Sequence, residues 1–363
     1  MKNNFLGRAS TGFTLIELLV SIAIGLFLVT VVGGVYLSSK DSFNYQDAMS
    51  RLQENSRFAM ERMARDIRMA GYTGCGDLSK VANTVNGGST NWWLNLLAPV
   101  VGYDNLSASQ TQFPGAVAGT DAIVLLGVGE GELSVISHNA LAATIQTTMH
   151  SIQPGAILLL TDCSQTSIFQ MSGPTNNNAN ATNVNHNTGN AVNPGNCNKQ
   201  LGASCPTQKA YTFRPGSSLL QMYANGYYVA PSCPPTNPSC STPPSASASD
   251  GNSLWVCSIT GQTGGTAPCS ELVHGVDDMQ IEYGVDTDGD TSADQYVTAN
   301  NVGNWGQVVS VRVSLLMATP PSAGRLSANP QTYTYNGTTP TTATDRRVRH
   351  VYSSTVNVRN RTK

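Results

Sequence analysis

The chain has 363 residues, a formal net charge of -2 at pH 7, and only 12% charged residues. This length predicts one large domain or two smaller ones. The near-neutral charge provides no basic field to attract phosphates, so no nucleic-acid contact is expected. The chain contains 8 cysteines, without a CxxC motif or a histidine at zinc-ligand spacing. This pattern favours disulfides in an oxidising compartment over a metal or thioredoxin-like site.

A basic leader precedes a long apolar stretch. The first residues, MKNNFLGRASTG, include Lys2 and Arg8 but no acid, and from Leu18 to Leu37 no residue is charged. At 1.5 Å per residue, this uncharged stretch would span about 30 Å as a helix, enough to cross a bilayer core. It is longer than the apolar region of an ordinary secretory signal. The positive charges predict that the leader stays on the cytoplasmic side of a membrane helix.

Glu17 lies near the start of this apolar stretch, where an uncompensated carboxylate is costly. A cut between Gly12 and Phe13 would create an α-amine, which is protonated at neutral pH. If such helices pack side by side, Glu17 of one chain can pair with the Phe13 amine of a neighbour. We therefore expect processing between Gly12 and Phe13 and a role for Glu17 in assembly. The alternatives are a plain membrane anchor and a signal peptide with an unusual acid.

The stretch GFTLIELLV, which starts at Gly12, resembles the processing motif of type IV prepilins and type II secretion pseudopilins. The resemblance implies that a prepilin peptidase cuts after Gly12 and that Phe13 becomes the N-methylated first residue of the mature chain. It also implies that Glu17 is the glutamate that the family carries five positions into the mature chain. The leader would be residues 1–12, and the membrane and filament-core helix residues 13–40.

Helical periodicity continues beyond the membrane stretch. From Tyr45 to Ala70, apolar residues recur with a period of about 3.6 residues, which is typical of an amphipathic helix. No proline interrupts the chain before Gly71, so a helix of about 58 residues and about 87 Å is expected, with residues 41–71 as its second half. Three i, i+4 charge pairs are expected on its solvent-facing side: Arg57–Glu61, Glu61–Arg65 and Arg62–Asp66.

Residues 72–363 are predicted to form a β-rich head. Two low-complexity stretches, 174–206 and 230–252, are rich in Asn, Ser and Pro and are expected to be surface loops. The strand-like runs are Asp121–Val128, Ala156–Cys163, Ser167–Met171, Lys209–Gly216, Ser253–Ile259, Met279–Val285, Val308–Ala318 and His350–Asn360.

Local disulfides are expected to hold the long loops in place. Eight cysteines allow many pairings, and these stay open at this stage. The pairs favoured by proximity in the sequence are Cys197–Cys205, Cys233–Cys240 and Cys257–Cys269, which leaves Cys75–Cys163.

An acidic segment, DTDGDTSADQYV from Asp286 to Val297, resembles part of a calcium-binding loop. Its acids at Asp286, Asp288, Asp290 and Asp294 correspond to positions one, three, five and nine of such a loop. The glycine is displaced from position six, and Val297 replaces the glutamate expected at position twelve. Ca2+ is therefore one interpretation, a solvated acidic turn is the other, and no cofactor is expected to be essential.

No enzyme signature is present. The sequence has no HExxH, GxSxG or phosphate-loop motif. The histidines are scattered along the chain, and each is expected to be a surface or hydrogen-bonded residue. They are His138, His150, His186, His274 and His350. We therefore expect a protein that is not an enzyme.

Four further segments are similar to PilW-type minor pilins: Arg51–Asp77, Leu158–Gln170, Glu271–Asp290 and Val356–Arg361. The resemblance implies an α+β, type IV pilin-like fold, with a long N-terminal helix packed on an antiparallel β-sheet head. It implies a minor pilin that helps to initiate the pilus and to shape its tip. Twitching motility, cell adhesion and DNA uptake stay open as the output of the fibre. The alternatives are a type II secretion pseudopilin and a membrane-anchored, calcium-dependent adhesin module.

The same resemblance implies partners and a location. The partners would be other minor pilins, the major pilin, the prepilin peptidase, the assembly machinery of the inner membrane and a tip adhesin. The chain would first be a single-pass inner-membrane protein with a periplasmic head, and later a part of the pilus fibre at the cell surface.

Overall fold

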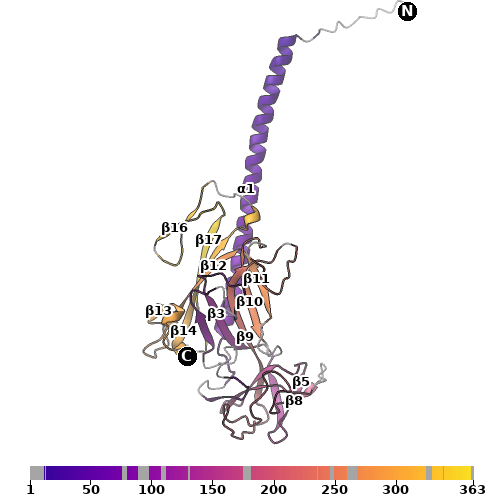
Figure 1. Cartoon of the computed structure of the whole chain (residues 1–363), viewed down its shortest axis with the longest axis vertical. Helices are drawn as coiled ribbons and strands as arrows, with labels where there is room; N and C mark the ends of the chain where they lie inside the picture. Colours follow the sequence, from indigo (N-terminus) through magenta and orange to yellow (C-terminus); the bar gives the residue numbers. More distant parts are fainter. Residues whose placement is uncertain are drawn as a thin grey trace, which may run out of the picture. The chain divides into compact units, whose positions relative to one another are not determined.

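The protein divides into two compact units, Met1–Arg51 and Leu52–Lys363. One helix, α1 (Leu15–Met69), contributes to both (Figure 1). The computed structural model describes residues 12, 14–75, 80–88, 98–107, 112–129, 131–174, 181–234, 236–245, 249–259, 268–323, 329–337 and 339–360.

The helix α1 has 55 residues, which confirms the long helix predicted from the sequence. It ends at Met69 because Gly71 adopts a positive φ of 72°, a conformation that commonly terminates helices. The N–H of Gly71 then donates to the carbonyl of Leu126, which ties the helix end to the head.

The second half of α1 buries one stripe of side chains in the head. Leu52, Ala59, Met63 and Ile67 are at most 3% exposed, so the amphipathic prediction is confirmed there. Charged residues follow the prediction less closely. Arg57 and Glu61 form the expected surface pair, but Asp66 is 4% exposed, so the prediction that it faces solvent was wrong.

The larger sheet has 11 strands. Seven of them follow one another in the order β1-β7-β6-β9-β4-β5-β8. The other four branch from β9: β3 and β10 pair with β9, β2 pairs with β3, and β11 pairs with β10. All described pairs are antiparallel except β1 with β7. Its strands are β1 (Val81–Asn83), β2 (Val100–Tyr103), β3 (Ala122–Val128), β4 (Leu133–Asn139), β5 (Thr144–His150), β6 (Ile157–Thr161), β7 (Thr166–Gln170), β8 (Ala181–Asn185), β9 (Ser218–Pro231), β10 (Asn252–Ile259) and β11 (Cys269–His274).

The strand β9 is the centre of this sheet. Its first residues, up to Gln221, pair with β4 and β6, whereas from Met222 onward it pairs with β3 and β10. Two hydrophobic clusters form along it, one that includes Trp255 and Tyr228 and another that includes Phe169 and Phe213. A single long strand thus connects two regions of the head (Figure 1).

The second sheet is antiparallel and ordered β13-β12-β14-β17. Its strands are β12 (Val276–Val285), β13 (Gln295–Val297), β14 (Val308–Ala318) and β17 (Arg349–Asn357). A separate hairpin joins β15 (Thr332–Thr334) to β16 (Pro340–Thr342). Short 3-10 helices span Ala299–Asn301, Trp305–Gln307 and Pro321–Ala323. The strand predicted at Val308–Ala318 is confirmed with the same bounds.

A buried aspartate connects the two sheets. The N–H of Asp121 donates to the carbonyl of Met279, and its carboxylate accepts the N–H groups of Asn105 and Ile281. Nearby, β2 approaches β12 so closely that a Cβ on Gly102 would lie 2.1 Å from the Tyr283 hydroxyl oxygen. Glycine is therefore required where these two strands meet.

Some strand and loop predictions were wrong. Lys209–Gly216 is not a strand, and Ala181–Asn185, inside the predicted loop 174–206, forms β8. This loop also carries buried residues, among them Asn196 and Asn198. Their side-chain amides satisfy backbone groups, so an Asn-rich segment can be ordered without a large apolar content.

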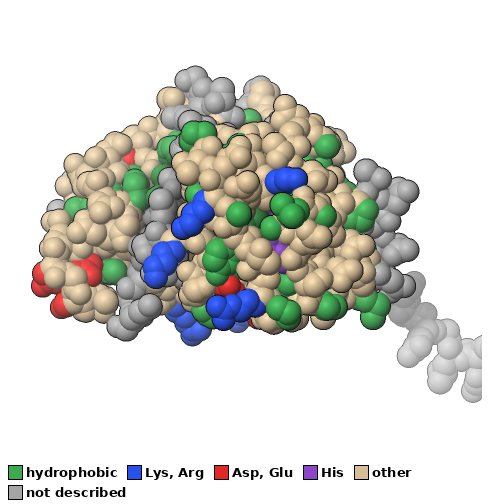
Figure 2. All heavy atoms as spheres, turned by 90° about the horizontal axis from the view of Figure 1, so that it is seen from below, with side chains coloured by type: hydrophobic (Ala, Val, Ile, Leu, Met, Phe, Trp, Pro, Cys, Tyr) green, Lys and Arg blue, Asp and Glu red, His purple; other side chains and the backbone are tan. Residues whose placement is uncertain are grey.

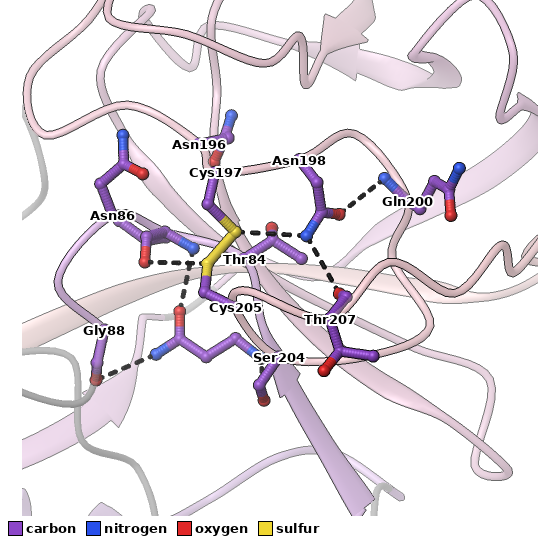
Figure 3. Close-up of a disulfide and its surroundings, with 12 residues drawn as sticks. Thr84, Asn86, Gly88, Asn196, Cys197, Asn198, Gln200, Ser204, Cys205 and Thr207 are labelled. Atoms are coloured by element: carbon purple, nitrogen blue, oxygen red, sulfur yellow. Dashed lines mark hydrogen bonds between the residues drawn. A yellow bond between two sulfur atoms is a disulfide. The ribbon is translucent and has the colours of Figure 1, made fainter.

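The four disulfides are Cys75–Cys163, Cys197–Cys205, Cys233–Cys240 and Cys257–Cys269. The last three are the pairs favoured by proximity in the sequence, and Cys75–Cys163 is the pair that these three left. Figure 3 shows that Cys197–Cys205 lies beside Thr84 and Asn86. The N–H groups of Cys197 and Cys205 donate to the carbonyls of Thr84 and Asn83. This bridge therefore holds a long loop against the segment that contains β1.

Candidate functional site

Of the predicted processing and assembly residues, Gly12 precedes α1 and is exposed, and Glu17 lies in its first turn. Phe13 lies outside the residues that the structure describes. A Cβ added to Gly12 would have no heavy atom within 4 Å. The fold therefore does not require glycine at position 12. Any requirement for a glycine there would come from the protein that recognises the predicted leader.

Glu17 caps its own helix. One carboxylate oxygen, Oε2, accepts the N–H of Thr14 at 3.0 Å and its hydroxyl at 2.9 Å, while the N–H of Glu17 donates to Thr14 Oγ1 at 3.3 Å. This reciprocal arrangement is a capping box. It was not among the predictions from the sequence, although the residues T-L-I-E carry its signature of Thr followed three positions later by Glu.

The helix that follows is apolar and exposed along its whole first half. Large side chains from Leu15 to Leu37 are about half or more exposed, and α1 is the one helix in the described part of the chain that is long and apolar enough to span a membrane. Its polar side chains are satisfied locally, since Ser21 and Thr30 donate to the carbonyls of Glu17 and Leu26. Such a surface suits lipid or a bundle of similar helices.

The predicted acidic loop is the turn between β12 and β13. Carboxylate oxygens of Asp286, Asp288 and Asp294 lie within 4.8 Å of one another, and these carboxylates could supply oxygen ligands to a cation. The fourth predicted residue, Asp290, is not part of this group, and its carboxylate accepts the N–H of Ser292 at 2.7 Å.

Carboxylates of this turn already accept hydrogen bonds from other residues of the same turn. Asp286 accepts the N–H groups of Gly289 and Thr291, at 2.6 and 2.9 Å. Thr287 donates its hydroxyl and N–H to Asp294, which lowers the pKa of that carboxyl. These bonds stabilise an acidic turn with or without a cation.

Two of the histidines that are scattered along the sequence meet in the head. His138 and His186 are packed together, with 3.2 Å between their Nε2 atoms. His138 Nδ1 accepts the N–H of Phe213, so its Nε2 carries the proton and donates it to His186. The pair is a buried structural contact between β4 and the residue that follows β8.

Two family models match the chain. Residues 245–360, which contain β10 to β17, match type IV pilus-assembly protein W. Residues 7–33, which contain the second half of the predicted leader, Glu17 and most of the apolar stretch, match the prokaryotic N-terminal methylation motif. No curated protein and no solved structure matches the chain.

The methylation motif accounts for the exposed apolar helix near the N-terminus, and the second match covers the C-terminal part of the head. Together the two matches support a type IV pilin-like protein of the PilW type, whose N-terminal helix holds it in the inner membrane before it enters the pilus.

Proposed function

We propose that the protein is a minor pilin, a structural subunit that helps to initiate the pilus and to shape its tip complex. The observation that carries this proposal is the methylation motif and exposed apolar helix on a chain whose head matches PilW. Its partners are other minor pilins, the major pilin, the prepilin peptidase, the inner-membrane assembly machinery and a tip adhesin. The role is structural rather than enzymatic.

The start of α1 suggests how assembly proceeds. Cleavage after Gly12 leaves a protonated amine on Phe13. Within the described residues, Glu17 uses only Oε2 for its capping bonds, so Oε1 is left to accept the amine of a neighbouring subunit. Pairing neutralises both charges as the helices leave lipid for a bundle of like helices. Such a contact joins different faces of successive subunits and produces an open helical filament.

The low copy number expected of a minor pilin follows from the head. Eleven strands in one sheet and loops stapled by disulfides make a large head to repeat along a thin fibre. A large subunit is better accommodated at an end of the fibre, where it has fewer neighbours. We therefore place it in few copies near the tip or the base of the fibre, beside other minor pilins.

Protein sequencing and quantitative mass spectrometry of sheared pili test this function. The chain should begin at Phe13 and be far less abundant than the major subunit. Gly12→Arg should remain uncut and absent from the fibre, whereas Gly7→Arg, which adds the same charge elsewhere in the leader, should be processed. A different mature N-terminus, or an abundance equal to the major subunit, would contradict the proposal. Absence of the wild-type chain from sheared pili would favour a secretion pseudopilin instead.

Calcium binding at Asp286, Asp288 and Asp294 stays a prediction, supported by the convergence of their carboxylates. Calcium would reduce the repulsion among these groups and brace the turn between β12 and β13. The thermal midpoint of the full-length protein in detergent should then be higher in calcium than in chelator. Asp288→Ala should abolish the difference, whereas Asp250→Ala, outside the turn, should preserve it. Equal midpoints for the wild type would refute calcium binding.

A further inference from the structure

A basic groove lies between the second half of α1 and the end of β17. It has a volume of about 490 Å³, and three of its lining residues are arginines: Arg65, Arg68 and Arg359. Met60, Ala64 and Met69 supply an apolar floor. The whole groove belongs to the unit Leu52–Lys363, so its geometry does not depend on the membrane half of the helix.

The positive charge of this groove is not neutralised by its surroundings. All three arginines are exposed, and within the described ranges none lies within 4.0 Å of a carboxylate oxygen. The one acid that lines the groove, Glu61, has its carboxylate 3.6 Å from Arg57. The groove therefore suits an anionic ligand, and arginine is the side chain best shaped to bind carboxylates bidentately.

The strand β17 is an edge strand beside this groove. Among the described strands it pairs only with β14, and Ser354 from its centre lines the groove. An edge strand presents backbone N–H and C=O groups that can pair with another chain.

The direction of these backbone groups follows from the register. Val358 donates its backbone N–H to the carbonyl of Val309 in β14, so the backbone N–H and C=O groups of even-numbered residues in β17 point toward β14. The backbone groups of Arg349 point away from β14, because its N–H and C=O are both bonded to the side chain of Gln331, at 2.7 and 2.8 Å. By alternation, the N–H and C=O groups of Val351, Ser353, Thr355 and Asn357 also point outward. No hydrogen bond from the described residues reaches these groups.

We propose that β17 accepts an extended segment of another pilus subunit as an added β-strand, and that this segment places acidic side chains over the groove of Arg65, Arg68 and Arg359. The outward backbone groups supply the pairing, and alternate side chains of the added strand face the groove as Ser354 does. The identity of the partner as a pilus subunit rests on the proposed function. The ladder of backbone donors and acceptors favours a peptide over a nucleic acid, which has phosphates but no backbone N–H.

A peptide-binding experiment on the full-length protein in detergent micelles tests this surface directly. The probe is a heptapeptide of alternating Val and Glu, and the controls are a Val and Lys heptapeptide and a single-stranded oligodeoxynucleotide. The acidic peptide should bind saturably and protect the amides of Val351, Ser353, Thr355 and Asn357 from hydrogen exchange. The basic peptide should not bind, and the oligonucleotide should not displace the acidic one.

Two pairs of variants separate backbone pairing from charge. Thr355→Pro removes one outward N–H and should weaken peptide binding at least tenfold, whereas Thr355→Val keeps that N–H and should bind normally. Arg68→Glu, on the exposed face of α1, should also weaken binding at least tenfold, whereas Arg346→Glu, an equal charge change at an exposed site before β17, should not. The Arg68 and Arg346 pair keeps the test decisive if Thr355→Pro unfolds.

The inference is overturned if the acidic peptide does not bind, if Arg68→Glu leaves binding unchanged, or if a folded Thr355→Pro binds normally. Preferential binding of the oligonucleotide would also overturn it and would indicate a nucleic-acid surface. Failure here leaves processing at Gly12 and incorporation into pili unaffected, so the proposed function is tested separately.

Discussion

Glu17 forms a helix cap that the structure shows, and the proposed function gives the same side chain a second role as a charge partner in assembly. The cap needs only an acceptor oxygen for the N–H and hydroxyl of Thr14. Pairing with a neighbour's amine needs a negative charge. Because glutamine can replace glutamate in a capping box, the two roles can be separated by mutation.

Glu17→Gln should insert into the membrane but fail to enter the fibre, because it keeps the cap and loses the charge. Glu17→Ala should behave in the same way. The control is Thr14→Val, which removes the capping hydroxyl, retains the charge at Glu17 and should be incorporated. The measurement is the amount of each variant in sheared pili relative to membranes. Normal incorporation of Glu17→Gln would show that the cap, and not the charge, is what the fibre needs.

The contact between the partly buried His138 and the buried His186 is expected to make head stability sensitive to pH. Burial lowers the pKa of His138 to about 4, and burial together with the neighbouring His138 lowers the pKa of His186 to about 3. A histidine in the unfolded chain has a pKa of about 6.5. Below this pH the unfolded chain binds protons that the folded head does not bind. The contribution of the two histidines to the free energy of unfolding is therefore fully present above this pH and is lost as the pH falls below it.

Protonation of each histidine in the unfolded chain should lower the free energy of unfolding of the head by about 2 kcal/mol as the pH falls from about 7 to about 5. His186→Gln should lessen this loss, because Gln does not titrate and its oxygen can accept the proton of His138. His350→Gln, at an exposed site, should leave the pH dependence unchanged. Urea unfolding of the full-length variants across this range measures the effect. Asp121, whose pKa burial raises to about 6, acts in the opposite direction equally in all variants. Identical pH profiles for wild type and His186→Gln would refute the assignment.

At the scale of elements, a buried polar contact fixes α1 on β9. Asp66 accepts the Tyr227 hydroxyl at 2.5 Å and the Asn225 side-chain amide at 2.7 Å. Arg62, one turn earlier, lies 3.8 Å away and provides the opposite charge. Burial and the nearby Asp66 raise the pKa of Tyr227, so the hydroxyl remains a donor at all ordinary pH values.

Asp66→Ala should destabilise the head by about 3 kcal/mol, because it leaves two buried donors and a nearby cation without their acceptor. Asp47→Ala removes another i, i+4 partner of an arginine, but that pair is exposed, so the change should stay below about 1 kcal/mol. Chemical denaturation of full-length protein measures both. Similar losses for the two variants would mean that the contact with β9 adds nothing to the docking of the helix.

The surface of the head carries few charges on the face that Figure 2 shows. Most of that face is backbone or side chains that are neither charged nor hydrophobic, and the basic and acidic groups are few. The composition, with 12% charged residues, predicts such a surface. A protein of this kind has no extended basic field, so its recognition depends on local features such as a strand edge, a loop or an arginine groove.

Disulfides hold the loops of the head in place. Cys75–Cys163 closes a separation of 88 residues and joins the segment after α1 to the segment between β6 and β7. The other three close separations of at most 12 residues and hold loops in place. Together they allow surface loops of low apolar content to keep a defined course over the head.

Features that depend on neighbouring residues could be predicted from the amino-acid sequence. The apolar run and the period of about 3.6 residues predict α1, because both patterns repeat within a few turns. Strand β14 was predicted because its residues alternate. Three of the disulfides followed from short separations in the chain. The leader, Gly12 and Glu17 predicted the processing motif for the same reason, since all lie within one short segment.

Only the tertiary structure decided the features that join distant parts of the chain. The strand β9 was missed because most of its second half is buried on both faces, which removes the alternation that reveals a strand. Asp66 reads as a solvent-facing residue until Tyr227, 161 positions away, is placed against it. The groove likewise combines Arg65 and Arg68 of the helix with Arg359 after β17. Such contacts depend on how the elements pack, and no local pattern of residues encodes that packing.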